Sequence, residues 1–266
     1  MTTKRLRSNG AARYEKTEFD SPMRIAVISD IHGNLEALRE VLSDIDQAGA
    51  DSVVSLGDNI GYGPEPESVL RLLDERDIPS VMGNHELGAV DSSCASLFNP
   101  SAWKSLLITK RLLSRRSLNH IRTMPTKLVA QGCLFVHGSP PDSLTRSFLE
   151  GSLDEKRHIF HGMREKMGFV GHTHVLALVA FDGKRVEHDL FPEGCIHLPS
   201  GRQYIVNAGS VGQPRDGDFR AKYVLWDDRT RCLEIRFVPY NAAGTARRIL
   251  ELGFPKRNAD CLGVEI

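Results

Sequence analysis

Residues 24–49, RIAVISDIHGNLEALREVLSDIDQAG, contain a strand, a polar turn and a helix in direct succession. The β-branched run at residues 24–29 predicts a buried strand. Apolar residues then recur at the spacing of one helix face over residues 35–45, with Asn34 placed to cap the helix start and Gly49 its end. A strand leading into a helix is the repeating unit of sheets that contain parallel strands.

The next segments continue this alternation, and the second half of the chain changes character. A strand is predicted at residues 52–58, a helix at 68–76, a third strand at 78–82 and helical segments at 100–123. Beyond these, the chain reads as short strands at 127–136 (a hairpin), 166–174, 176–188, 203–210, 222–228 and 232–240, with a closing helix at 241–254. We therefore expect one α/β domain over residues 23–266, built from two packed sheets with helices outside.

Composition excludes several classes of function. The 266-residue chain has 34 basic and 34 acidic residues, so no global charge favours stable binding to nucleic acid or to an anionic membrane. No apolar run has the roughly 20 residues of a membrane-spanning helix. Five cysteines without a C-x-x-C pair argue against a disulfide framework and fit a reducing, cytoplasmic location. The polar, mostly basic residues 1–22 are interpreted as a disordered tail.

Metal-capable side chains occupy the same place after five apolar runs, at the point where each run ends in a turn. They are Asp30, His32, Asp58, Asn59, Asn84, His85, His137, His172 and His174. Ligands of open α/β sheets gather at the carboxyl ends of strands. Any one of these residues alone is more often an ordinary hydrogen-bonded polar residue. Their shared position nevertheless favours a joint metal site.

The residue types narrow the choice of metal. Imidazole and carboxylate without thiolate suit Mn, Fe, Zn, Ni or Co and argue against a closed structural zinc site. Seven or more candidate ligands exceed what one ion needs, so two divalent ions about 3.5–4 Å apart are expected. A carboxylate such as Asp58 can bridge such a pair.

The ordered motifs D-x-H, G-D-N, G-N-H-E, V-H-G and G-H-T-H resemble those of the calcineurin-like metallophosphoesterase superfamily. The segments GDNIGYGPEP and NAGSVGQPRDG are similar to a bacterial subgroup related to diadenosine tetraphosphatases and phosphodiesterases. The resemblance implies a four-layer αββα sandwich of two mixed sheets and two metal ions, with manganese favoured. By the same resemblance Asp58 bridges the ions. The first ion would be held by Asp30, His32 and His174, and the second by Asn84, His137 and His172.

The resemblance also implies an activity, the hydrolysis of phosphodiester or nucleotide-type substrates by in-line attack of a metal-bridging hydroxide. Asp58, Asn84 and His85 would then be the catalytic residues, with His85 protonating the leaving oxygen and binding neither ion. Two alternatives stay open. One is a Ser/Thr protein phosphatase-like phosphomonoesterase, with residues 90–123 as a cap that decides access. The other is a metal-binding interaction module without enzymatic activity.

Three further residues are candidates for contact with a small phosphorylated substrate. Arg215 can clamp a phosphate, or it can pair with Asp216 or Asp218. Asn59 and Tyr62 follow Asp58 on the same loop and can reach a substrate. Alternatively, Asn59 shapes a tight turn and Tyr62 packs against its neighbours.

Overall fold

Two mixed β-sheets face each other in the computed structural model, which describes residues 23–189 and 193–264. The first sheet has the strand order β2-β1-β10-β11-β8, and the second has the order β3-β4-β5-β9-β6-β7. Among the paired strands of the first sheet, only β1 and β2 pair in parallel, whereas in the second sheet β4 pairs in parallel with β5 and β5 with β9. The predicted tail at residues 1–22 lies outside the described residues.

The strands are β1 (Arg24–Ile28), β2 (Ser52–Ser55), β3 (Lys127–Ala130), β4 (Cys133–Val136), β5 (Met167–Val170), β6 (Leu176–Phe181), β7 (Val186–Asp189), β8 (Gly194–His197), β9 (Gln203–Ala208), β10 (Ala221–Asp227) and β11 (Cys232–Val238). The helices are α1 (Leu35–Ala48), α2 (Pro66–Glu75), α3 (Asn84–Val90), the 3-10 helix η1 (Ser92–Leu97), α4 (Pro100–Leu112), α5 (Arg115–Ile121), α6 (Leu153–Gly162), α7 (Ala242–Glu251) and α8 (Lys256–Asp260).

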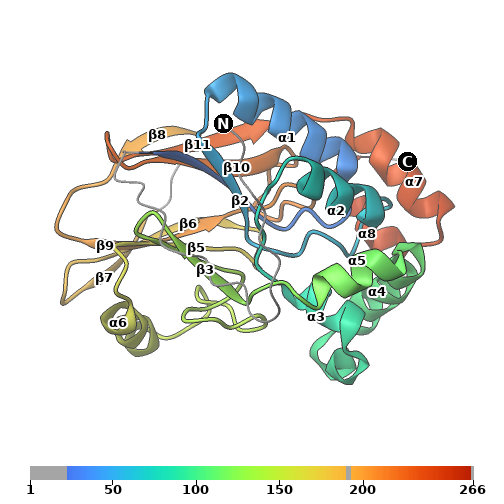
Figure 1. The fold of residues 1–266 in the computed structure, drawn as a ribbon, viewed down its shortest axis with the longest axis horizontal. Coiled ribbons are helices and arrows are strands. Elements are labelled where there is room, and N and C mark those ends of the chain that lie inside the picture. The colour runs from blue at the N-terminus through green and yellow to red at the C-terminus, as the bar shows by residue number, and fades with distance from the viewer. Residues whose placement is uncertain (1–22, 190–192, 265–266) are drawn as a thin grey trace, which may run out of the picture.

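Three apolar clusters separate the layers. Alternate side chains of β1 explain the first two: Ile25 and Val27 pack between the sheets, whereas Ala26 and Ile28 pack against α1 and α2. The third cluster joins the outer face of the second sheet to Phe160 of α6. Figure 1 shows α1 over one sheet and α6 beneath the other, with α3, α4 and α5 grouped at one end. The two-sheet α/β architecture expected from the sequence is confirmed.

Local structure follows the sequence closely in α1. The Asn34 side chain accepts a hydrogen bond from the Ala37 amide, and Gly49 ends the helix in the left-handed conformation, as predicted. The predicted third strand at residues 78–82 is wrong, because the structure has only an isolated bridge between Ser55 and Ser80 there. The pattern also left β8, α3, α6 and α8 unpredicted.

Two further expectations concern the environment of the chain. Cys195 of β8 and Cys232 of β11 form a disulfide, which the sequence argument against paired cysteines missed. The two residues lie in neighbouring antiparallel strands that are 37 positions apart in the sequence. Within the described residues, no helix is long and apolar enough to cross a membrane. The cytoplasmic location stays a prediction.

Candidate metal centre

The candidate ligands lie on turns that follow the strands, and many of these turns are strained. Five of the candidates are non-glycine residues in the left-handed region, with φ values of 52° for Asp30, 50° for His32, 51° for Asp58, 70° for His172 and 62° for His174. Such conformations are uncommon outside glycine, and they gather where the surrounding structure holds a functional geometry. The backbone therefore aims these side chains at a stability cost.

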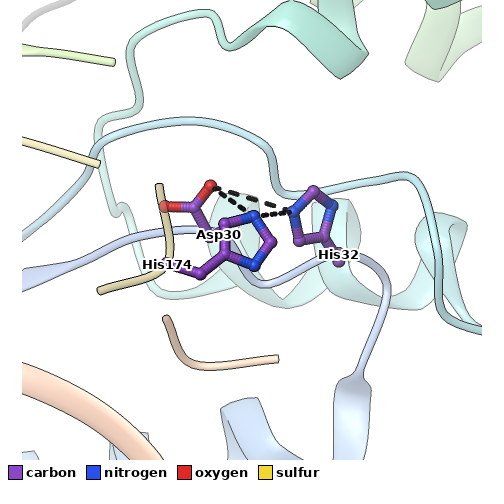
Figure 2. A group of neighbouring side chains, drawn as sticks. All are labelled: Asp30, His32 and His174. Atoms are coloured by element: carbon purple, nitrogen blue, oxygen red, sulfur yellow. Dashed lines mark hydrogen bonds and ion pairs between the residues drawn. The ribbon is translucent and has the colours of Figure 1, made fainter. Parts of the chain in front are cut away.

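Asp30, His32 and His174 form one group, shown in Figure 2. The two imidazole Nε2 atoms lie 3.0 Å apart, and Asp30 Oδ1 lies 3.3 Å from that of His174. His32 Nδ1 donates to the Ile60 carbonyl at 3.0 Å, and His174 Nδ1 donates to the Gln213 carbonyl at 2.6 Å. Because a carbonyl oxygen only accepts, both neutral rings carry their proton on Nδ1 and direct Nε2 lone pairs toward one point.

Asn84, His137 and His172 form a second group. His137 Nδ1 donates to the Leu56 carbonyl, so its Nε2 faces Asn84 Oδ1 at 3.1 Å. The same Nε2 lies 3.2 Å from His172 Nδ1. Asp58 stands between the two groups, because its Oδ2 lies 3.3 Å from His137 Nε2 and 3.8 Å from His32 Nε2.

These contacts fit bound cations. In the first group, lone pairs converge without a donor between them, and buried Asp30 Oδ1 has no hydrogen-bond partner among the described residues. Burial raises the pKa of Asp30 to about 7. Burial also disfavours a charge on His137, yet the Asp58 carboxylate raises the pKa of that ring to about 9. A proton there takes the place that a metal ion would fill. The donor set of imidazole, carboxylate and amide oxygen suits divalent transition metals.

The imidazoles of His32, His172 and His174 stay neutral at physiological pH. Burial lowers the pKa of His32 and that of His174 well below the ordinary value. Burial, and then the charge on His137, lower the pKa of His172 to about 4. Neutral imidazoles are the form that binds metal, so these three rings need lose no proton when an ion enters.

His85 lies beside the two groups rather than inside either. Its ring packs edge-on against those of His32 and Phe98, with centroids 4.8 and 5.3 Å away, and it is 2% exposed. A ring nitrogen of His85 also comes within 4.8 Å of ligand atoms of His32 and Asp58. Burial lowers the pKa of His85, although Asp58 opposes the shift.

A cavity of ≈ 230 Å³ opens over these side chains. Its lining residues are Asp58, Tyr62, Asn84, His85, Glu150, His172, Thr173, His174 and Arg215. Arg215 donates to Gln213 at 2.8 Å and lies over the Tyr62 ring. The two carboxylates proposed as alternative ion-pair partners of Arg215 pair with other residues, Asp216 with Lys222 and Asp218 with Arg220.

Two residues differ from the sequence prediction for this cavity. Of the two alternatives for Asn59, contact with a substrate is not supported, because this residue is fully buried and does not line the cavity. It accepts from Ser55 at 2.6 Å and donates to Ser80 at 2.9 Å, so it shapes the loop instead. Glu150, which carries no recognisable motif, lines the cavity without an ion-pair partner among the described residues.

Glu86 is a second residue that the sequence analysis missed, although it completes the G-N-H-E motif. Its buried carboxylate accepts four backbone N–H groups, from Asp58, Asn59, Ile60 and Gly83. Burial raises the pKa of Glu86 to about 7, but these donors occupy both oxygens and hold the anion. The sequence did contain a signal for this role of Glu86. It is an acidic residue three positions after Gly83, which precedes the first residue of α3.

Several known proteins are similar to this chain. Residues 23–230 match the model of the calcineurin-like phosphoesterase superfamily domain. An uncharacterized protein of Methanocaldococcus jannaschii is 32% identical over 246 residues, which cover 87% of this chain and 94% of that protein. A crystal structure of a metallophosphoesterase from Sphaerobacter thermophilus is 31% identical with a TM-score of 0.75, covering 91% of this chain and 99% of the other.

A shorter match joins the chain to a protein phosphatase. The serine/threonine-protein phosphatase 2 of Escherichia coli is 39% identical over 83 residues, 31% of this chain and 38% of that protein. The family model covers most of the described chain, including every candidate metal ligand. The protein therefore belongs to the calcineurin-like phosphoesterase superfamily and is a phosphoesterase of the hydrolase class.

Proposed function

We propose that this protein is a binuclear metal-dependent phosphoesterase that hydrolyses phosphodiesters, with nucleotide-type esters among its substrates. One observation carries the proposal: a single cavity is lined by ligands of both candidate metal groups, by His85 and by Arg215. Asp30, His32 and His174 would hold one ion, Asn84, His137 and His172 the other, and Asp58 would bridge them. Manganese is the ion that we expect to support the highest activity.

Divalent ions at such a site supply Lewis acidity toward phosphoryl oxygens and hydroxide at neutral pH. The chain's own groups complete the reaction. Arg215 donates to the non-bridging oxygens and orients the ester. As the bond from phosphorus to the incoming oxygen forms and the bond to the leaving oxygen breaks, the imidazolium form of His85, which the Asp58 carboxylate favours, gives its proton to the leaving oxygen and becomes neutral imidazole. Tyr62 lines the cavity beside Arg215 and His85. Arg215 lies over the Tyr62 ring, and the centroid of that ring is 4.6 Å from the centroid of the His85 ring.

One lining charge, that of Glu150, supports a diester over a monoester, whereas Arg215 and the bound ions would attract both kinds of ester. Arg215 is the cation among the lining residues, and Glu150 places an anion on the same lining. A diester carries one negative charge at neutral pH and a monoester nearly two, so Glu150 repels the monoester more strongly. The phosphomonoesterase alternative draws on the partial match to the E. coli protein phosphatase.

A metal-by-substrate screen tests the proposal. Chelator-treated protein is reloaded with Mn²⁺, Ni²⁺, Co²⁺ or Mg²⁺ and assayed with bis-p-nitrophenyl phosphate and p-nitrophenyl phosphate. We expect metal-dependent turnover with a higher kcat/KM for the diester. A higher value for the monoester would support the phosphatase alternative, and no turnover with any metal would support a binding module.

The role of His85 has its own test. His85→Ala should retain both ions by mass spectrometric metal analysis while losing about 10²–10⁴-fold in kcat, the range for a lost general acid. His120→Ala, which removes an exposed histidine of α5, is the matched control and should change neither quantity. Loss of an ion in the His85 variant would reassign this residue as a ligand.

A further inference from the structure

The loop that carries Gly61 and Tyr62 presses directly on the ring of His85. Gly61 has φ +136°, and a Cβ there would lie 2.4 Å from His85 Nδ1 and 2.8 Å from His32 Nδ1. The Tyr62 ring lies 4.5 Å from that of His32 and 4.6 Å from that of His85. Any displacement of this loop therefore moves or frees the His85 ring.

Among the described residues, no side-chain hydrogen bond fixes the orientation of the His85 ring. Its Nδ1 is buried and has no hydrogen-bond partner in the described part of the chain. A catalytic imidazole is usually oriented by a carboxylate or carbonyl at the nitrogen that does not react. Here the packing of Gly61, Tyr62 and Phe98 must hold the ring instead.

Two buried side chains from distant helices hold that loop in place. Thr109 of α4 is fully buried and donates its hydroxyl to the Gly61 carbonyl. Asn258 of α8 is 3% exposed and donates to the Tyr62 carbonyl at 3.0 Å. The same Asn258 amide donates to Ser105 of α4 at 2.9 Å, which joins the two helices behind the loop.

We infer that Thr109 and Asn258 are positioning residues that set the geometry of proton delivery by His85. Each acts through a loop carbonyl, and neither lines the cavity. The family match ends at residue 230, so Asn258 and the whole of α8 lie beyond it. The inference rests on the proposed function, because it assigns a purpose to the orientation of His85. It also gives α4, within the predicted cap region, a role in holding the site.

The test compares two thymidine 5′-phosphate esters that differ only in the leaving group, p-nitrophenol or the more basic phenol. A misplaced proton donor slows the phenyl ester more, because phenolate needs the proton more. Thr109→Val should lower kcat for the phenyl ester about tenfold to a hundredfold, with a smaller effect on the nitrophenyl ester. KM and the content of both ions should stay within twofold of wild type.

Three variants separate positioning from a general loss of stability. Thr109→Ser keeps the hydroxyl and should retain the wild-type ratio of the two rates. Asn258→Ala should shift the ratio in the same direction as Thr109→Val, and it serves alone if the valine variant does not fold. Tyr223→Phe removes a hydroxyl that donates to Asp44 of α1, and it should destabilise the protein without changing the ratio.

The outcomes are distinct. An unchanged ratio in the folded Thr109→Val or Asn258→Ala protein overturns the inference while leaving the proposed function intact. A shift of the ratio in Tyr223→Phe as large as that in Thr109→Val would also overturn the inference and leave the proposed function intact. Failure of the wild-type protein to hydrolyse either ester with any metal refutes the proposed function, and the positioning role with it.

Discussion

Replacing Glu86 by glutamine tests whether one buried carboxylate holds together the loops that carry two candidate ligands. Oε2 accepts the amides of Asp58 and Gly83 at 2.8 and 2.9 Å, and Oε1 accepts those of Asn59 and Ile60 at 2.8 and 3.3 Å. Glutamine keeps the shape of the side chain but turns one oxygen into an NH₂ donor. Two of the four backbone donors then lose their acceptor and face another donor.

The structure sets the magnitude. Hydrogen bonds to a charged group contribute about 1.5–3 kcal/mol each, so the loss of two predicts about 3–6 kcal/mol of destabilisation. Typical proteins have a free energy of unfolding of about 5–15 kcal/mol, so the expected destabilisation is a large share of that free energy. Because Glu86 also fixes the loops of Asp58 and Asn84, we expect the folded fraction of the variant to bind less metal.

The assay is urea denaturation at a fixed metal concentration, followed by circular dichroism, with metal content measured on the same samples. The midpoint should fall by about 1 M or more. Glu155→Gln is the matched control, since Glu155 also accepts a backbone amide, from Ser152 at 2.8 Å, but is exposed. If Glu86→Gln shifts the midpoint no more than Glu155→Gln does, the assignment of Glu86 as the anchor of these loops is refuted.

Three other predictions concern the same centre. Asp58→Asn should lower metal content below two ions, because it removes the carboxylate between the groups, and full occupancy by metal analysis would exclude bridging. Gly61→Ala should reduce kcat at least tenfold, since its Cβ would meet His85 Nδ1 at 2.4 Å, and unchanged kinetics would show that the loop yields freely. Metal binding at pH 7 should release protons, because the pKa of His137 is raised to about 9 and an ion must displace that proton. Affinity should accordingly fall as pH falls, and calorimetric heats that do not depend on the buffer's ionisation enthalpy would contradict this.

Much of the fold could be predicted because the signals are local. The helical spacing of apolar residues after Asn34 and the β-branched run at residues 24–29 each report on a few neighbouring residues. Strand β8 was not predicted, because its four residues contain too few periods to distinguish a strand from a turn. The partners β3 and β4 could be predicted as a hairpin because they adjoin in the sequence. Distant partners could not, since β1 pairs with β10, about 200 residues later. For the same reason the disulfide between β8 and β11 had no sequence signal.

The candidate site shows the same difference between local features, which the sequence predicts, and long-range contacts, which it does not. The sequence by itself determined which residues carry metal-binding chemistry, because side-chain type and position after a strand are written in the chain. The family resemblance already grouped His174 with His32, and the structure places their Nε2 atoms 3.0 Å apart. Only the tertiary structure decided that Glu150 lines the cavity and that Asn59 bonds within its own loop. The supports of His85 also come from α4 and α8, which no motif marks. Hydrogen bonds and packing act over a few ångströms in space, so their effect depends on which segments the fold brings together rather than on their order in the chain.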